Sequence, residues 1–228
     1  MSLKLKTNVS LIIFDVDGTL VGGESADWAS FSAAFKEAAG FAFAPDFFLR
    51  IEEITAQAIV HQALVNHTLE EKKAIESAVR CGYLKYLTAA HKNDPCAFSS
   101  TPGSIALLED LKSRQIPLAI ATGDWFETIT FKLTAASIPF KHLPMATSSD
   151  RYSRADIIAL AAAKAGVPID GAIYVGDGAW DFRACKKLGI PFIGVGSKVE
   201  KLRQAGATHI LPDLTPATFW QTVEKITI

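Results

Sequence analysis

A short apolar run that ends in two carboxylates constrains this chain more than any other feature. Leu11–Phe14 are all apolar, Asp15 and Asp17 follow with one residue between them, and Gly18 ends the run. A continuous apolar segment of this kind predicts a strand buried on both faces. Parallel α/β sheets bind their ligands beyond the carboxyl ends of the strands, so Asp15 and Asp17 are predicted to lie at a functional site.

The two neighbouring acids also require a compensating positive charge. Carboxylates this close repel each other unless a cation or a shared proton intervenes. A hard divalent cation bound by oxygen atoms is the natural compensation, and Mg²⁺ is the usual ion of this type. We therefore expect Mg²⁺ near Asp15 and Asp17.

The composition predicts a folded chain without a strong charge bias. The 228 residues suffice for one large or two modest domains, and 49% hydrophobic residues can form a sizeable core. Lys and Arg total 23 against 24 Asp and Glu, so no general field attracts nucleic acid or an anionic membrane. Three cysteines (Cys81, Cys96 and Cys185) without a Cys-x-x-Cys pattern predict free thiols. Because Met1–Ser10 contains no cleavable apolar segment, we expect a soluble, cytoplasmic protein.

After Val21 the pattern changes from strand-like to helical. Residues 22–98 contain no strand-like run and are predicted to be helical throughout. Apolar residues at three- and four-residue spacing end at Gly40, and a capping box at Thr68 predicts the start of another helix. Between them, residues 45–59 predict one helical segment.

Strands and helices alternate through the rest of the chain. This alternation predicts a doubly wound parallel (Rossmann-like) sheet of the α/β class with right-handed crossovers. The chain is thus expected to form an α/β core from residues 1–21 and 99–228, with an all-helical cap domain, residues 22–98, inserted between them. The further strands are predicted at residues 116–121, 143–146, 172–176, 191–195 and 209–211.

Residues 14–20, FDVDGTL, resemble the first motif of the haloacid dehalogenase-like hydrolase superfamily. A helical insert after this motif is typical of the subgroup that contains phosphoglycolate phosphatases, β-phosphoglucomutase and haloacid dehalogenases. Most members of the superfamily are Mg²⁺-dependent phosphatases that act through an aspartyl-phosphate. The resemblance implies the same activity here, on a small phosphorylated metabolite.

Later positions match further motifs of the superfamily. Thr122 and Gly123 follow a predicted strand and match the second motif, where a hydroxyl and backbone N–H groups bind a phosphoryl oxygen. Residues 176–181, GDGAWD, match the fourth motif, which supplies acids to the metal. Asp177 and Asp181 lie four apart and fall on one face of a first helical turn.

The third motif departs from the superfamily pattern, which places a Lys before the helix that precedes the fourth-motif strand. Arg151 and Arg154 are the basic residues available there. Arg154, in the first turn of a helix with a Ser153-x-x-Asp156 capping box, is our choice, because a guanidinium can hold Asp15 and a phosphate oxygen together. Arg151 is the alternative.

The resemblance implies a role for each of these residues. Asp15 is the predicted nucleophile and Asp17 the predicted general acid and base. Thr122, Gly123 and Arg154 are expected to bind phosphate. The expected ligands of Mg²⁺ are Asp15, Asp17 through its backbone carbonyl, Asp177 and Asp181.

Alternative functions remain open at this point. A dehalogenase would also use Asp15 but would need neither an acid at Asp17 nor a metal. A phosphomutase would use every core residue named above. A third alternative is a core that has lost catalytic activity and only binds a ligand, which would explain the missing Lys. The natural substrate is open, and so is the choice between a monomer and a homodimer.

Polar and aromatic residues of the helical segment give weaker signals. The aromatic cluster at residues 41–48 is expected to form the core of the cap. Four polar residues could face the site but are expected to be ordinary surface or packing residues: Glu24, Arg50, His61 and His67.

Overall fold

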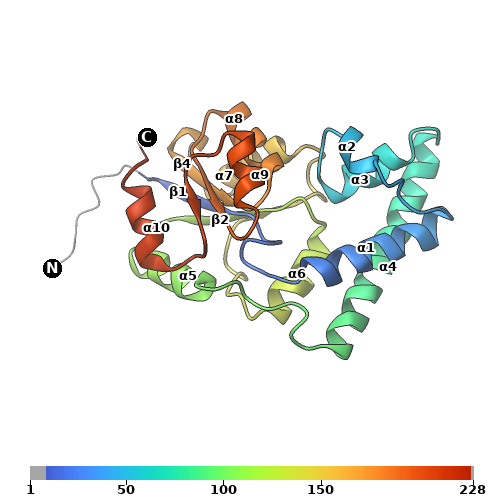
Figure 1. Ribbon diagram of the computed structural model, residues 1–228, viewed down its shortest axis with the longest axis horizontal. Helices are drawn as coiled ribbons and strands as arrows, with labels where there is room; N and C mark the ends of the chain where they lie inside the picture. The colour runs from blue at the N-terminus through green and yellow to red at the C-terminus, as the bar shows by residue number, and fades with distance from the viewer. Residues whose placement is uncertain (1–8, 227–228) are drawn as a thin grey trace.

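The computed structural model describes residues 9–226 and contains a six-stranded sheet between two layers of helices (Figure 1). Residues 1–8, where the sequence predicts no cleavable leader, lie outside the described part. Every strand pair is parallel and the order is β3-β2-β1-β4-β5-β6, which confirms the doubly wound α/β prediction. The strands are β1 (Leu11–Phe14), β2 (Leu118–Ala121), β3 (Met145–Ala146), β4 (Ala172–Gly176), β5 (Phe192–Val195) and β6 (Ile210–Leu211).

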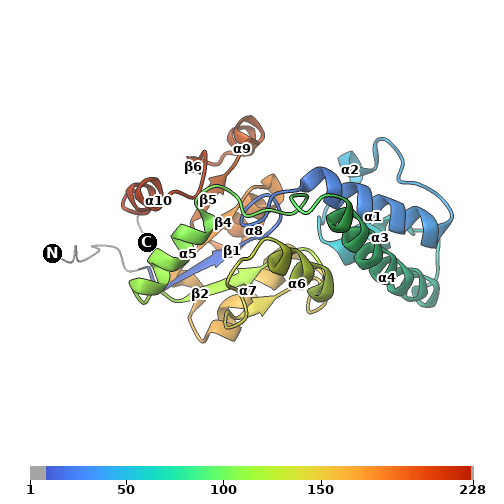
Figure 2. The same ribbon diagram turned by 90° about the horizontal axis from the view of Figure 1, so that it is seen from below.

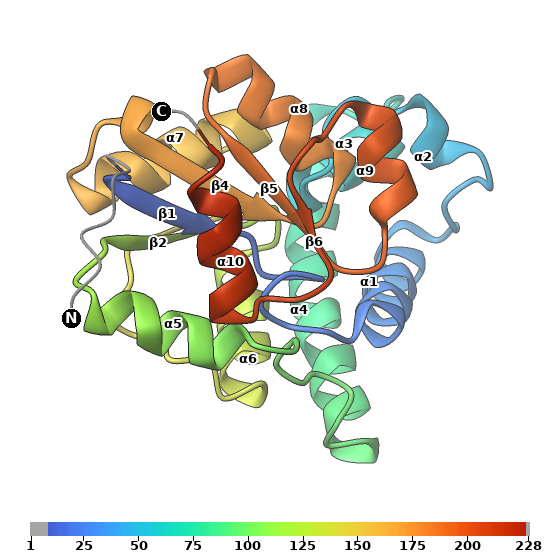
Figure 3. The same ribbon diagram turned by 60° about the vertical axis from the view of Figure 1, so that its left-hand side comes forward.

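Alternating side chains of the strands hold a helical layer against each face (Figure 3). In β1, Leu11 and Ile13 pack on one face, while Ile12 and Phe14 pack on the other. All four are fully buried, as expected for a central parallel strand. The first layer contains α7 (Arg154–Ala165), α8 (Ala179–Leu188) and α9 (Val199–Ala205), and the second contains α5 (Ser104–Ser113), α6 (Phe126–Ala135) and α10 (Pro216–Val223).

The strand order creates a crevice at the end of β1. The chain runs outward from β1 to β2 and β3, and it then returns to place β4 on the opposite side of β1. The connections therefore diverge beyond the carboxyl ends of β1 and β4, where doubly wound folds bind ligands. These ends point toward four further helices of the chain (Figure 2).

These four helices come from the segment between β1 and α5. Aromatic rings of this segment pack together, as predicted: Phe43 stacks on Phe35 with ring centroids 4.0 Å apart. α1 ends at Gly40, and Thr68 and Glu71 form the predicted capping box. The helices are α1 (Glu24–Ala39), α2 (Phe47–Arg50), α3 (Ala56–Ala63) and α4 (Leu69–Asn93).

The expectation of one helical segment over residues 45–59 is wrong, because α2 and α3 are separated by an extended stretch. Ile51 and Thr55 have extended backbones, and the Thr55 hydroxyl caps α3 by accepting from the Ala58 N–H at 3.2 Å. β-Branched residues are weak helix formers. The Ile54 carbonyl accepts from Arg154 Nη2 at 3.3 Å rather than from a helical N–H. The Ala56 N–H donates to the Gly123 carbonyl at 2.7 Å, which brings this stretch to the carboxyl end of β2.

Candidate active site

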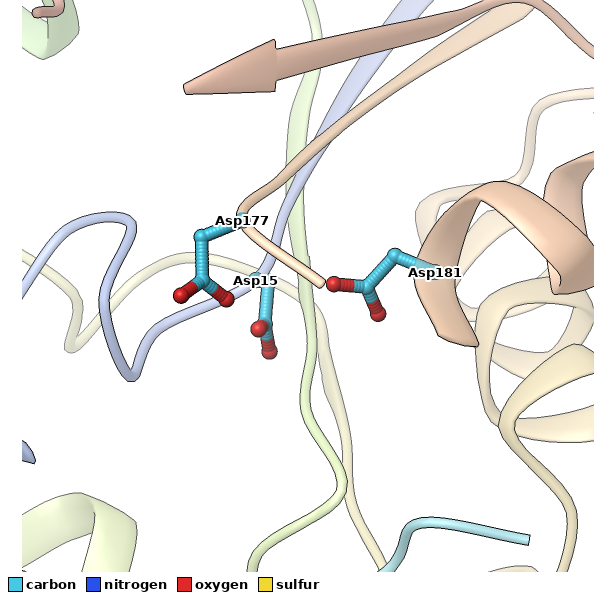
Figure 4. A group of neighbouring side chains, drawn as sticks. All are labelled: Asp15, Asp177 and Asp181. Carbon is cyan, nitrogen blue, oxygen red and sulfur yellow. The ribbon is translucent and has the colours of Figure 1, made fainter. Parts of the chain in front are cut away.

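Three buried carboxylates meet at the crevice (Figure 4). Asp15 follows β1, Asp177 follows β4, and Asp181 lies in the first turn of α8. One oxygen of each lies within 4.8 Å of the others. Figure 4 shows Asp15 and Asp177 side by side, with Asp181 projecting toward them from its helix. Gly18 has a positive φ of 77°, and a Cβ there would collide with the Asp177 carboxylate, so only glycine permits this approach.

Arg154 joins the cluster from the first turn of α7. The helix begins there because the Ser153 hydroxyl accepts from the Asp156 N–H, as predicted. The Arg154 Nη1 lies 3.1 Å from Asp15 Oδ1, and its Nε lies 3.4 Å from Asp181 Oδ1. Burial alone would lower the Arg154 pKa, but the two carboxylates raise it above its usual range, so the guanidinium stays charged.

Arg151, the alternative basic residue before α7, does not contact Asp15. Arg151 is exposed and donates to the neighbouring Asp150 carbonyl. Arg154 is therefore the residue that the structure brings to Asp15.

The predicted phosphate-binding residues of the second motif lie beside Arg154. Thr122 is buried directly after β2, and its hydroxyl oxygen accepts from the Asp124 N–H at 3.3 Å. A Cβ on Gly123 would lie 2.7 Å from Arg154 Nη2 and 2.9 Å from the Ile54 carbonyl oxygen. Only glycine fits between these two groups, and so the loop can approach the guanidinium.

Asp17 belongs to a second cluster, built around a lysine that the sequence analysis missed. Lys132 of α6 is completely buried, and its Nζ lies 2.6 Å from Asp17, 2.7 Å from Asp27 and 2.8 Å from Asp124. The Tyr83 hydroxyl donates to Asp27 at 2.5 Å. Asp27 and Tyr83 come from α1 and α4, whereas the other three residues come from the core. The only local signal is a charged residue next to Ile129 and Leu133 on the buried face of α6.

The electrostatics of this second cluster favour a charged lysine. Burial lowers the Lys132 pKa, but Asp124, Asp17 and Asp27 together raise it well above its usual range. Burial raises the pKa of Asp17 well above its ordinary value, although Lys132 opposes the change. A raised carboxyl pKa suits a group that must donate a proton.

A further lysine lies beside Asp177. Lys198 Nζ is 2.6 Å from Asp177 Oδ2 and also pairs with Glu24 of α1. Burial raises the Asp177 pKa to about 7, with Lys198 opposing and Asp15 adding to the rise. Glu24, expected to be an ordinary surface residue, thus approaches the site.

The other three polar candidates of the helical segment, Arg50, His61 and His67, have partners away from the three-carboxylate cluster. Arg50 pairs with exposed Asp46, and His61 pairs with Glu76 at 2.8 Å within the segment. His67 packs beside the Phe41 ring.

The donor set of the first cluster fits a hard divalent cation. Asp15, Asp177 and Asp181 provide only oxygen atoms, and the nearby cations Arg154 and Lys198 are fewer than these acids. The Asp17 side chain is not part of this set. Its predicted metal role rests on the backbone carbonyl and stays a prediction.

The family model of haloacid dehalogenase-like hydrolases matches residues 12–195. The chain belongs to this family. The match confirms the resemblance based on residues 14–20 and makes the chain an enzyme of the hydrolase class. Enzymes of the haloacid dehalogenase-like family generally use a divalent metal, which agrees with the oxygen-rich cluster.

Solved structures of other proteins share the fold over almost the whole chain. A predicted phosphoglycolate phosphatase from Haemophilus somnus is 19% identical (TM-score 0.68; 95% of this chain and 99% of that chain). CbbY from Rhodobacter sphaeroides in complex with phosphate is 20% identical (TM-score 0.69; 91% and 95%). A β-phosphoglucomutase from Clostridium difficile is 17% identical (TM-score 0.74; 95% and 98%). At these identities the likeness establishes the fold alone.

A search of curated proteins found no match to this chain. Among residues 9–226, the helices are all too short or too polar to cross a lipid bilayer.

The two arginines before α7 provide a direct test of the site geometry. Arg154→Ala is expected to lower kcat/KM for a phosphate ester by about 10²–10³-fold, because a charge-assisted contact to the phosphoryl oxygens is lost. Arg151→Ala, a matched change three residues away on the surface, should leave it within about twofold. Steady-state kinetics of both variants give the two kcat/KM values to be compared. A larger loss for Arg151→Ala would contradict the assignment.

Proposed function

We propose that this chain is a Mg²⁺-dependent phosphatase that hydrolyses a small phosphate monoester through an aspartyl-phosphate. The observation that carries the proposal is the position of Asp15. Its carboxylate lies at the end of β1, 3.1 Å from Arg154 and within the oxygen cluster that fits a divalent cation. A cavity beside Asp15 is lined by Thr122 and Gly123 as well.

In the first step, an Asp15 carboxylate oxygen attacks phosphorus and the ester oxygen leaves. Arg154 and Thr122 hold the equatorial oxygens and stabilise their growing charge. Asp17, whose pKa is raised by burial, donates its proton to the leaving oxygen. The products of this step are the free alcohol and a phosphorylated Asp15.

In the second step, water hydrolyses the acyl phosphate. Asp17, now a carboxylate, accepts a proton from the attacking water, and Asp15 is restored as inorganic phosphate leaves. Bound Mg²⁺, held by Asp15, Asp177, Asp181 and the Asp17 carbonyl, would supply positive charge against the repulsion between carboxylate and phosphate.

Residues 22–98 are proposed to act as a cap domain over a core of residues 1–21 and 99–228. Two contacts support this role, because both join the segment to the phosphate-binding loops. Ala56 N–H donates to the Gly123 carbonyl, and the Arg154 N–H donates to Glu53 Oε2 at 3.1 Å. A cap in this position would exclude bulk water from the acyl phosphate. The cytoplasmic location stays a prediction, as does the choice between a monomer and a homodimer.

A phosphomutase of the same family is the second candidate, since it would use the same core residues. The structural likeness to a protein named as a β-phosphoglucomutase supports this second candidate. The cavity beside Asp15, about 140 Å³, favours hydrolysis of a small ester over rearrangement of a sugar phosphate. The complete set of acids disfavours a retired binding protein.

Activity with and without a divalent cation tests the proposal. The protein is expected to release phosphate from p-nitrophenyl phosphate with Mg²⁺ and to lose at least about 10²-fold of kcat in excess chelator, because carboxylate and phosphate then repel each other. Activity should return when Mg²⁺ is restored. Full activity in chelator would contradict the metal assignment, and no phosphate release under any condition would contradict the phosphatase.

A further inference from the structure

The cavity beside Asp15 is small and its two walls differ. Its volume is about 140 Å³, well below the roughly 300 Å³ at which typical small-molecule sites begin. The core supplies a polar wall that contains Asp15, Asp17, Asp124 and Arg154. The helical segment supplies mainly aromatic and aliphatic side chains, which are Trp28, Phe31, Ile54, Ile59 and Tyr83.

The polar wall contains no free cation that could pair with a second anionic group of the substrate. Among the described residues that line the cavity, Arg154 is the one cation, and the proposed mechanism assigns it to the phosphoryl group. Lys132 lies behind the wall, but three carboxylates already surround its single charge within 2.8 Å. With Asp17 protonated, as the proposed first step requires, an added anion would still meet the Asp27 and Asp124 carboxylates, against which Lys132 has a single positive charge.

The opposite wall presents a fixed apolar surface. Trp28 is 43% exposed, although several rings support it. Its ring centroid lies 4.9 Å from Phe48, 5.6 Å from Phe43 and 6.0 Å from Phe31. Aromatic rings packed in this way provide contact area for an apolar ligand at a low cost in side-chain entropy.

We propose that the alcohol portion of the substrate is a small uncharged group that packs against Trp28 and Phe31, and that Asp27, with Asp124, excludes esters carrying a second anionic group. This inference rests on the proposed phosphatase function and adds the substrate class. Rejection by an unpaired like charge is a common source of specificity.

A pair of esters of equal size tests the exclusion. 2-Phosphoglycolate and its carboxamide differ only in a carboxylate against a neutral amide. The amide is expected to have a kcat/KM at least about tenfold higher, because the carboxylate must approach the acids around Lys132. Equal values, or a higher value for the carboxylate, would overturn the inference.

A variant of Asp27 tests whether the acids around Lys132 cause the preference for the amide over the carboxylate. Asp27→Asn removes one negative charge with little change of shape, so the ratio between amide and carboxylate should fall at least about threefold. Asp46→Asn, which removes an exposed acid of the same segment that pairs with Arg50, should leave the ratio unchanged. An unchanged ratio in a folded Asp27→Asn protein would overturn the role of Asp27. If that variant does not fold, the ester pair on the unaltered protein still decides the substrate class.

p-Nitrophenyl phosphate separates this inference from the proposed function. If the protein hydrolyses that ester and also prefers 2-phosphoglycolate, the phosphatase stands and the substrate class is wrong. If it hydrolyses none of the three esters with Mg²⁺, the phosphatase and the substrate class both fail.

Discussion

Asp15→Asn is expected to lower kcat for p-nitrophenyl phosphate by roughly 10⁴-fold or more, because an amide cannot attack phosphorus to form the acyl phosphate. The fold should persist, since Arg154 keeps its second partner, Asp181, at 3.4 Å. Phosphate release measures the loss, and thermal unfolding measures the fold. Mass spectrometry after acid quench should find phosphate on Asp15 in the unaltered protein and none in the variant.

Asp170→Asn is the matched control, because Asp170 is exposed and lies in the turn before β4, away from the crevice. Its kcat should stay within about twofold of the unaltered protein. Near-normal turnover by Asp15→Asn would refute the aspartyl-phosphate route. Phosphate attached to another residue in the unaltered protein would do the same.

Lys132→Met is expected to lower the free energy of unfolding by about 3–5 kcal/mol, because it leaves three carboxylates near a completely buried position without their cation. Lys85→Met is the control, since Lys85 is exposed and its nearest acid, Glu37, lies 3.8 Å away. That change should alter stability by no more than about 0.5 kcal/mol. Chemical denaturation of both variants gives the comparison.

The destabilisation by Lys132→Met should grow with pH. Without the ammonium, repulsion raises the folded-state pKa values of Asp17 and Asp124 further above those of the unfolded chain. The unfolded chain loses its protons first as pH rises, so the folded variant becomes less stable as the pH rises above about 4, the ordinary pKa of an aspartate. Adding Asp27→Asn should recover part of the loss. A variant as stable as the unaltered protein at pH 8 would show that the three acids do not need Lys132.

The same lysine is expected to position Asp17 for proton transfer. Lys132→Met should therefore reduce kcat more than it changes KM, because Asp17 acts on the leaving oxygen in the transition state. Equal changes in kcat and KM, or none, would contradict this positioning role.

Most of the fold could be predicted from the sequence because its signals are local. The apolar run at residues 11–14 marks a central strand, since only a strand covered on both faces buries every side chain in a row. Capping residues such as Ser153 and Thr68 marked helix starts, and the alternation of elements predicted a parallel sheet. The prediction of one helical segment over residues 45–59 failed at residues 51–55. There the Ile54 carbonyl accepts from Arg154, and the Thr55 hydroxyl donates to the Tyr152 carbonyl.

The sequence by itself determined the sheet and the positions of Asp15, Asp177 and Asp181. Acids that directly follow parallel strands, or begin the helix after one, must meet at a single edge once the strands pair. The sequence also indicated Arg154 as a cation beside Asp15, but only the tertiary structure decided the partners of the two lysines near the site. Lys132 and Asp27 are 105 positions apart, and Lys198 and Glu24 are 174 apart. No local pattern predicts such pairs, because a lysine is buried only where several distant elements bring carboxylates to it.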